Sequence, residues 1–163
     1  MFKRWLYSED TIALGLLVLR VGIGIAFVVH GFPKVFMGGA VGLSKGLAAT
    51  GIPGGIVAAY LAGGAEFFGG IALILGLLTR PATAVMAFNM LIALIFHLNK
   101  GDKFVAYSHA LESGILFLSL FIAGPGKFSL DYLFWREKSE SKDVPYRVAA
   151  PKAGYGIGHA KPA

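Results

Sequence analysis

Four long apolar runs constrain the fold of this chain more than any other feature. They cover about residues 12–31, 56–78, 81–98 and 107–124 of the 163-residue sequence. Each run reaches or approaches the ~20 residues that cross a hydrocarbon core of ~30 Å as a helix. Because lipid offers no partner for backbone N–H and C=O groups, a spanning segment must satisfy them internally. We therefore predict an all-α protein, an integral membrane four-helix bundle.

The composition fits a membrane protein. Hydrophobic residues make up 56% of the chain and charged residues 15%, against roughly 45–50% and about 25% in soluble domains. The net charge of +6 comes from residues beside the apolar runs or in the tail, so it indicates contact with the lipid bilayer and not with nucleic acid. The chain has no cysteine, so electron transfer would need a bound cofactor or a protein partner.

The segments between the runs predict the domain organisation. Residues 1–136 form the transmembrane domain, and residues 137–163 form a polar tail without periodicity, which we expect to be flexible. The glycine-rich stretch 32–55 contains a possible short interfacial or re-entrant helix at 41–49. The turn at 79–81 is too short for anything but an antiparallel hairpin of the second and third helices.

The distribution of lysine and arginine predicts the orientation. More of these residues flank the side that carries both termini than the opposite side, so we expect both termini in the cytoplasm. The first side carries Lys3, Arg4, Arg80, Lys127, Arg136, Lys138 and Lys142, and the second carries Lys34, Lys45, Lys100 and Lys103.

Seven charged, amide or histidine residues lie within the apolar runs, where such groups are costly enough to be functional candidates. At 1.5 Å per residue from the cytoplasmic helix ends, four of them fall at depths of roughly 12–18 Å and three histidines at roughly 22–27 Å. We expect the first four to form one mid-membrane layer and the histidines an outer layer. The mid-membrane residues are Arg20, Glu66, Asn89 and Glu112, and the outer residues are His30, His97 and His109.

The mid-membrane layer has two interpretations. In the structural one, Arg20 pairs with Glu66 or Glu112 to fix helix register, and Asn89 forms an interhelical hydrogen bond. In the functional one, the second carboxyl is decisive, because one arginine cannot neutralise two glutamates. That carboxyl must be protonated, or meet a cation, a histidine or a ligand. A carboxyl beside histidines suits proton transfer at a quinone or along a relay.

Metal and haem sites are not expected. His109 and Glu112 are three residues apart and share a helix face, but di-iron bundles use a Glu-x-x-His pair on each of two helices together with two further carboxylates. His30 and His97 lie at similar depth, yet two histidines at one height are weak evidence for haem ligation. We therefore predict no metal site.

Several motifs resemble those of one family. The residues Leu19-Arg20-Val21, His30-Gly31-Phe32-Pro33-Lys34, Ala65 to Gly70, Gly76 to Arg80 and Gly124 to Asp131 together resemble the DoxX/DoxD-like small membrane proteins. The resemblance implies a multi-pass protein of the inner (plasma) membrane of a bacterium or archaeon. It also implies an association with thiosulfate:quinone oxidoreductase or other membrane-bound oxidoreductase assemblies. Among the residues above, it points to Arg20, His30, Lys34, Glu66 and Glu112.

Our leading hypothesis is a membrane subunit of a quinone-linked redox system. Arg20, Glu66 and Glu112 would be its catalytic residues, with the outer histidines passing protons to the surface. One alternative is a non-catalytic scaffold or accessory subunit that binds protein partners in a larger membrane complex, and another is a small-anion or proton transporter. The expected cofactor is a quinone, bound with the help of His30, Lys34, Asn89, His97 and His109.

Overall fold

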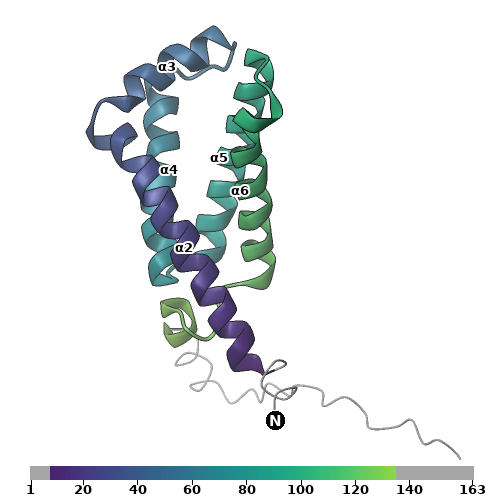
Figure 1. The fold of residues 1–163 in the computed structure, drawn as a ribbon. Helices are drawn as coiled ribbons and strands as arrows, with labels where there is room; N and C mark the ends of the chain where they lie inside the picture. The colour runs from purple at the N-terminus through teal and green to yellow at the C-terminus, as the bar shows by residue number, and fades with distance from the viewer. Residues whose placement is uncertain (1–7, 135–163) are drawn as a thin grey trace, which may run out of the picture.

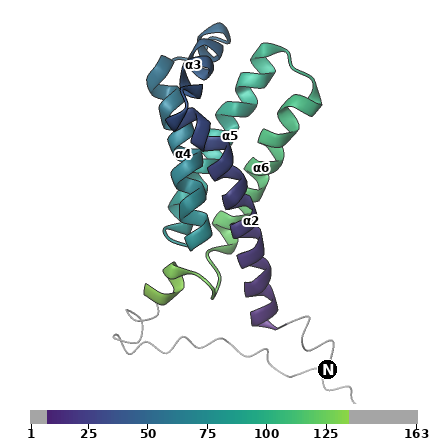
Figure 2. The ribbon, with the colours of Figure 1, turned by 60° about the vertical axis from the view of Figure 1, so that its left-hand side comes forward.

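The computed structural model describes residues 8–134, and in that part of the chain the regular elements are helices (Figures 1 and 2). They are α2 (Glu9–Phe36), α3 (Gly39–Ala49), α4 (Gly55–Leu75), α5 (Thr79–Lys100) and α6 (Phe104–Ala123), followed by a helical turn at 130–134. The helices α2, α4, α5 and α6 are long and apolar enough to cross a membrane. This confirms the four-span prediction, while the predicted tail at 137–163 lies outside the described residues.

Helix α2 is longer than the sequence predicted. It begins at Glu9 because the Ser8 side chain accepts a hydrogen bond from the Thr11 amide (3.2 Å). The predicted end at residue 31 is wrong, since the helix continues through Pro33 to Phe36. Proline in the last turn removes only one backbone donor, so the helix tolerates it there. As a result Lys34 lies on the helix, one turn beyond His30.

The helices α2 and α4 pack with their backbones in close contact. A Cβ added to Gly70 would lie 2.7 Å from the Gly24 carbonyl oxygen, and one added to Gly24 would lie 2.8 Å from that of Gly70. Gly31 faces the backbone around Phe67 in the same way. These small residues therefore bring the two helices together along much of their length.

The second pair consists of α5 and α6, and the two pairs diverge toward one end of the molecule (Figures 1 and 2). Buried side chains from all four long helices form the shared core, among them Phe27, Leu73, Met90 and Phe117. Helix α3 confirms the short helix predicted between the first two spans. It lies across the end away from residues 8 and 134 (Figure 1).

Candidate functional site

An ion pair joins α2 to α4 in the half of the bundle nearest α3. The Lys34 ammonium lies 2.6 and 2.5 Å from the two carboxylate oxygens of Glu66. The Glu66 side chain is 6% exposed and that of Lys34 29%. Gly63, one turn before Glu66, leaves room for the lysine, because a Cβ there would lie 2.7 Å from Lys34 Cβ. Helix packing thus pairs a buried carboxylate with a partly exposed ammonium.

A third helix contributes to the same carboxylate. The Asn89 side chain on α5 donates to Glu66 Oε1 (3.4 Å) and to the Ala62 carbonyl (3.4 Å). Ionised carboxylates inside a membrane need such partners, since an unpaired charge there is strongly unfavourable. Of the four residues predicted to form one mid-membrane layer, Glu66 and Asn89 are in contact, and this contact connects α4 to α5.

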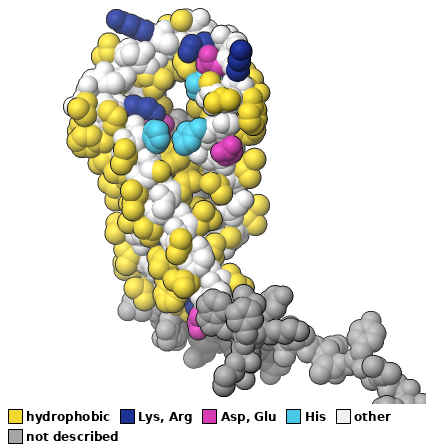
Figure 3. All heavy atoms as spheres, viewed as in Figure 1, with side chains coloured by type: hydrophobic (Ala, Val, Ile, Leu, Met, Phe, Trp, Pro, Cys, Tyr) yellow, Lys and Arg dark blue, Asp and Glu magenta, His cyan; other side chains and the backbone are white. Residues whose placement is uncertain are grey.

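Two histidines lie beside this ion pair. His30 precedes Lys34 by one turn of α2, and its ring centroid is 5.1 Å from that of His109 on α6. Phe27 stacks on His109 with a centroid distance of 5.8 Å. Both histidines are exposed, and Figure 3 shows the surface hollowed in this region, with histidine and lysine side chains at the margin. We call the group the polar cluster: His30, Lys34, Glu66, Asn89 and His109.

Glu112 lies at the edge of the polar cluster. It follows His109 by three residues on α6 and is exposed. Between residues 8 and 134 no side chain forms a hydrogen bond or ion pair with it, although its charge acts on His109. Of the two glutamates singled out in the sequence, Glu66 meets a cation and Glu112 is the surplus carboxyl.

The expected pair of Arg20 with a glutamate is wrong. Arg20 is fully buried, and its guanidinium donates to the carbonyls of Leu73 (3.3 Å) and Phe128 (2.5 Å). The depth estimate failed because it placed the cytoplasmic ends of all helices at one level. In the structure α2 extends well beyond the other helices at that end (Figure 1), so Arg20 is level with the turn between α4 and α5.

Around Arg20, the segment after α6 folds back onto the α4–α5 turn. The Asp131 carboxylate accepts hydrogen bonds from the amides of Leu78 and Thr79 (2.7 Å each) at the start of α5. Gly76 ends α4 in the left-handed conformation (φ 65°), and a Cβ there would overlap Arg20. The two motifs at 76–80 and 124–131 thus form one hydrogen-bonded unit, although they are far apart in the sequence.

His97 lies apart from the polar cluster. Its Nδ1 is 2.7 Å from Oδ2 of Asp102 in the turn between α5 and α6, and Lys100 is 3.4 Å from the same oxygen. The hydrogen bond with His97, followed by the charge of Lys100, lowers the pKa of Asp102. No ring contact joins His97 to His30, whose histidine neighbour is His109. The structure therefore does not bring together the two histidines considered for haem.

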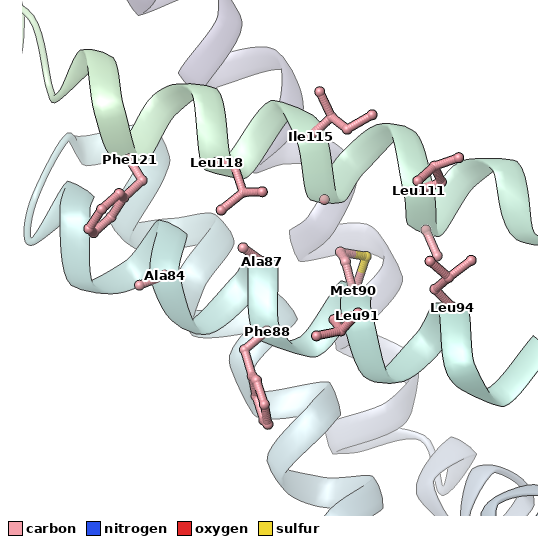
Figure 4. A pocket seen from close by; sticks show the side chains of 12 residues that line it. Ala84, Ala87, Phe88, Met90, Leu91, Leu94, Leu111, Ile115, Leu118 and Phe121 are labelled. Carbon is pink, nitrogen blue, oxygen red and sulfur yellow. The ribbon is translucent and has the colours of Figure 1, made fainter.

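A groove of about 380 Å³ between α5 and α6 is a second concave feature (Figure 4). Its lining consists of aliphatic, aromatic and glycine residues and one methionine, with Phe88, Leu91, Leu118 and Phe121 among them. None of these side chains can donate or accept a conventional hydrogen bond. The groove therefore cannot select a polar group, and the polar cluster is the candidate functional site.

Sequence reasoning missed the role of Lys34 as the partner of Glu66. The lysine was counted among the charges that flank the first span, because the helix was expected to end at residue 31. The resemblance pointed to Lys34 without giving it a role. The spacing His30-x-x-x-Lys34 was the available signal, since residues four apart share a helix face once the helix continues through Pro33.

Four membrane-crossing helices and a partly buried ion pair between two of them define a small multi-pass membrane protein. The chain belongs to the DoxX family, whose model matches residues 15–98. It is 34% identical over 123 residues to the inner membrane protein YqjF of Escherichia coli (strain K12), covering 74% of this chain and 92% of that protein. It is 32% identical over 124 residues to the inner membrane protein YphA of the same organism, covering 71% and 87%.

A protein of Haemophilus influenzae is 33% identical over 125 residues, covering 73% of this chain and 90% of the relative. No solved structure matches the chain. The four apolar helices and the inner membrane relatives together assign the chain to the inner membrane, which confirms the predicted location.

Proposed function

We propose that this DoxX-family protein is the quinone-binding membrane subunit of a redox system, and that the polar cluster holds the quinone head group. The observation that carries the proposal is the Lys34–Glu66 ion pair, which is buried on the glutamate side and open on the lysine side. A lysine ammonium has three donors, so it can keep the carboxylate and also donate to a quinone carbonyl.

The chemistry of the cluster suits proton exchange at such a carbonyl. Reduction of a quinone to a quinol adds two electrons and two protons, and oxidation returns them. His30 and His109 are groups whose ordinary pKa lies near neutrality, and they stand beside the ion pair within one face of the bundle. In the proposal they exchange protons with the quinone oxygens, while Lys34 orients the ring.

The electrons come from a different protein in this proposal. The chain contains no cysteine, so it has no thiol couple, and we assign electron delivery to a partner subunit with its own redox centre. Arg20 has no part in the reaction, because its guanidinium is committed to the Leu73 and Phe128 carbonyls. Lys34 takes its place as the cation that pairs with Glu66.

The test is the quinone content of protein purified in lipid nanodiscs, measured by solvent extraction and mass spectrometry. We expect bound quinone in the wild type, and its loss in Lys34→Met and Glu66→Gln. Lys45→Met is the matched control, since Lys45 is an exposed lysine of α3 outside the polar cluster. Wild-type protein without quinone after incubation with it, or equal retention by Lys34→Met, would contradict the proposal.

A further inference from the structure

The helices α2 and α6 meet through aromatic side chains. Phe27 packs edge-on against Phe117 with ring centroids 4.8 Å apart, and its other neighbour across the contact is His109. His30 and His109 complete the contact on the side of the polar cluster. We call this contact, formed by Phe27, His30, His109 and Phe117, the α2–α6 seam. Unlike the glycine-mediated packing of α2 on α4, this contact is made by side chains.

The end of the bundle above the polar cluster is covered. Ala40 and Leu47 of α3 are buried against Ala59 of α4. On the other side α3 reaches α5, where the Asn99 side chain donates to the Thr50 carbonyl (3.1 Å). Helix α3 therefore spans from one helix pair to the other, and it stands between the polar cluster and the aqueous phase at this end.

The seam itself lies within the membrane-spanning part of the helices. His30 is six residues before the end of α2, and His109 five residues after the start of α6, which places both roughly 8–9 Å inside the helix ends. Exposed residues beside the two histidines include the apolar Val29 (66% exposed) on α2 and Leu111 (37%) on α6, together with Glu112. The open side of the polar cluster thus borders the hydrocarbon region.

We propose that ligands reach the polar cluster sideways from the bilayer through the α2–α6 seam, with His30 and His109 at the entrance. The ligand class is then a lipid-soluble molecule with a hydrogen-bonding head, and a free water-soluble anion is excluded. This inference deepens the proposed function and depends on the same site. It makes the two histidines the first polar groups that a head group meets on leaving the lipid.

Spin-label accessibility tests the route without any bound quinone. The cysteine-free chain allows a single nitroxide at position 30 or 112 through His30→Cys or Glu112→Cys, with oxygen as the lipid-borne relaxation agent and a nickel chelate as the aqueous one. Val29→Cys supplies the lipid reference and Lys45→Cys the aqueous reference. We expect the labels at positions 30 and 112 to show the same relative accessibility to oxygen and to the nickel chelate as the label at position 29. If these labels instead show the accessibility of the label at position 45, lateral access is contradicted and the quinone proposal is unaffected.

Cross-linking tests the entrance directly. A short reducible thiol cross-linker in His30→Cys/His109→Cys should stop the exchange of bound quinone for deuterated quinone, and reductant should restore it. The control is Phe32→Cys/Phe67→Cys, whose rings are 6.1 Å apart on the α2–α4 pair, and exchange should persist when it is cross-linked. Exchange that continues through the closed seam would overturn the inference. If even the Phe32→Cys/Phe67→Cys protein binds no quinone, the proposed function is contradicted. The spin-label accessibilities would then still test the access route.

Discussion

The Lys34 ammonium and the Glu66 carboxylate form an ion pair, with 2.6 Å between Nζ and Oε1, that fastens α2 to α4 inside the membrane. The pair depends on two features that are far apart in the chain. Pro33 must be accommodated within α2 for Lys34 to be helical, and Gly63 must lack a side chain for the lysine to reach across.

Removing one partner of the ion pair should cost more stability than removing both. Lys34→Met leaves the Glu66 carboxylate buried without its cation, which typically costs about 3–5 kcal/mol. The double variant Lys34→Met/Glu66→Met should recover much of that loss, because no unpaired charge remains. Thermal unfolding of the purified protein in one detergent measures both. Equal midpoints for Lys34→Met and the wild type would contradict a stabilising pair.

Arg20 should act on stability and not on quinone binding. Arg20→Lys loses the planar fork that reaches two carbonyls, and we expect a loss of about 1.5–3 kcal/mol, the usual contribution of a hydrogen bond to a charged group. Hydrogen exchange should rise at the Leu78 and Thr79 amides as their hydrogen bonds to Asp131 weaken. The protein that remains folded should keep its quinone, and a selective loss of quinone at wild-type stability would instead assign Arg20 to the site.

The glycines of α2 and α4 offer a matched comparison. Gly70→Ala places a Cβ against the Gly24 carbonyl, and overpacking of this kind typically costs about 1–3 kcal/mol. Gly22→Ala has open space around the new Cβ and should be neutral or stabilising by up to about 1 kcal/mol through helix propensity. Chemical denaturation of both variants gives the difference, and similar effects of the two would contradict close α2–α4 packing.

The turn between α5 and α6 should weaken in acid. The hydrogen bond with His97 lowers the pKa of Asp102 in the folded protein, so its contribution to stability is complete above the unfolded value of about 3.9. That contribution is lost as the pH falls through the lowered folded pKa. Asp102→Asn should be less stable than the wild type near neutrality, and the two should converge below about pH 4. A pH-independent difference would contradict this origin.

The family resemblance predicted the inner membrane location, and hydrophobicity along the chain was sufficient to predict the four membrane spans. Local physics governs the spans, because a segment in lipid must satisfy its own backbone and be long enough to cross. The depth count predicted one layer of four polar residues, and of these Glu66 and Asn89 are in contact. The helix ends were predicted less accurately, since α2 continues through Pro33 to Phe36 and does not end at residue 31.

Tertiary structure alone decided which charges pair. Arg20 and Lys34 lie on the same helix, 14 residues or four turns apart, and the sequence does not show which of them is level with Glu66. That depends on how far α2 extends past its neighbours, which is set by its glycine contacts with α4 and by the return of the segment at 124–131. The sequence by itself determined that charges would be buried in a four-helix membrane bundle. The vertical register of the helices, a property of packing between distant segments, determined which charges meet.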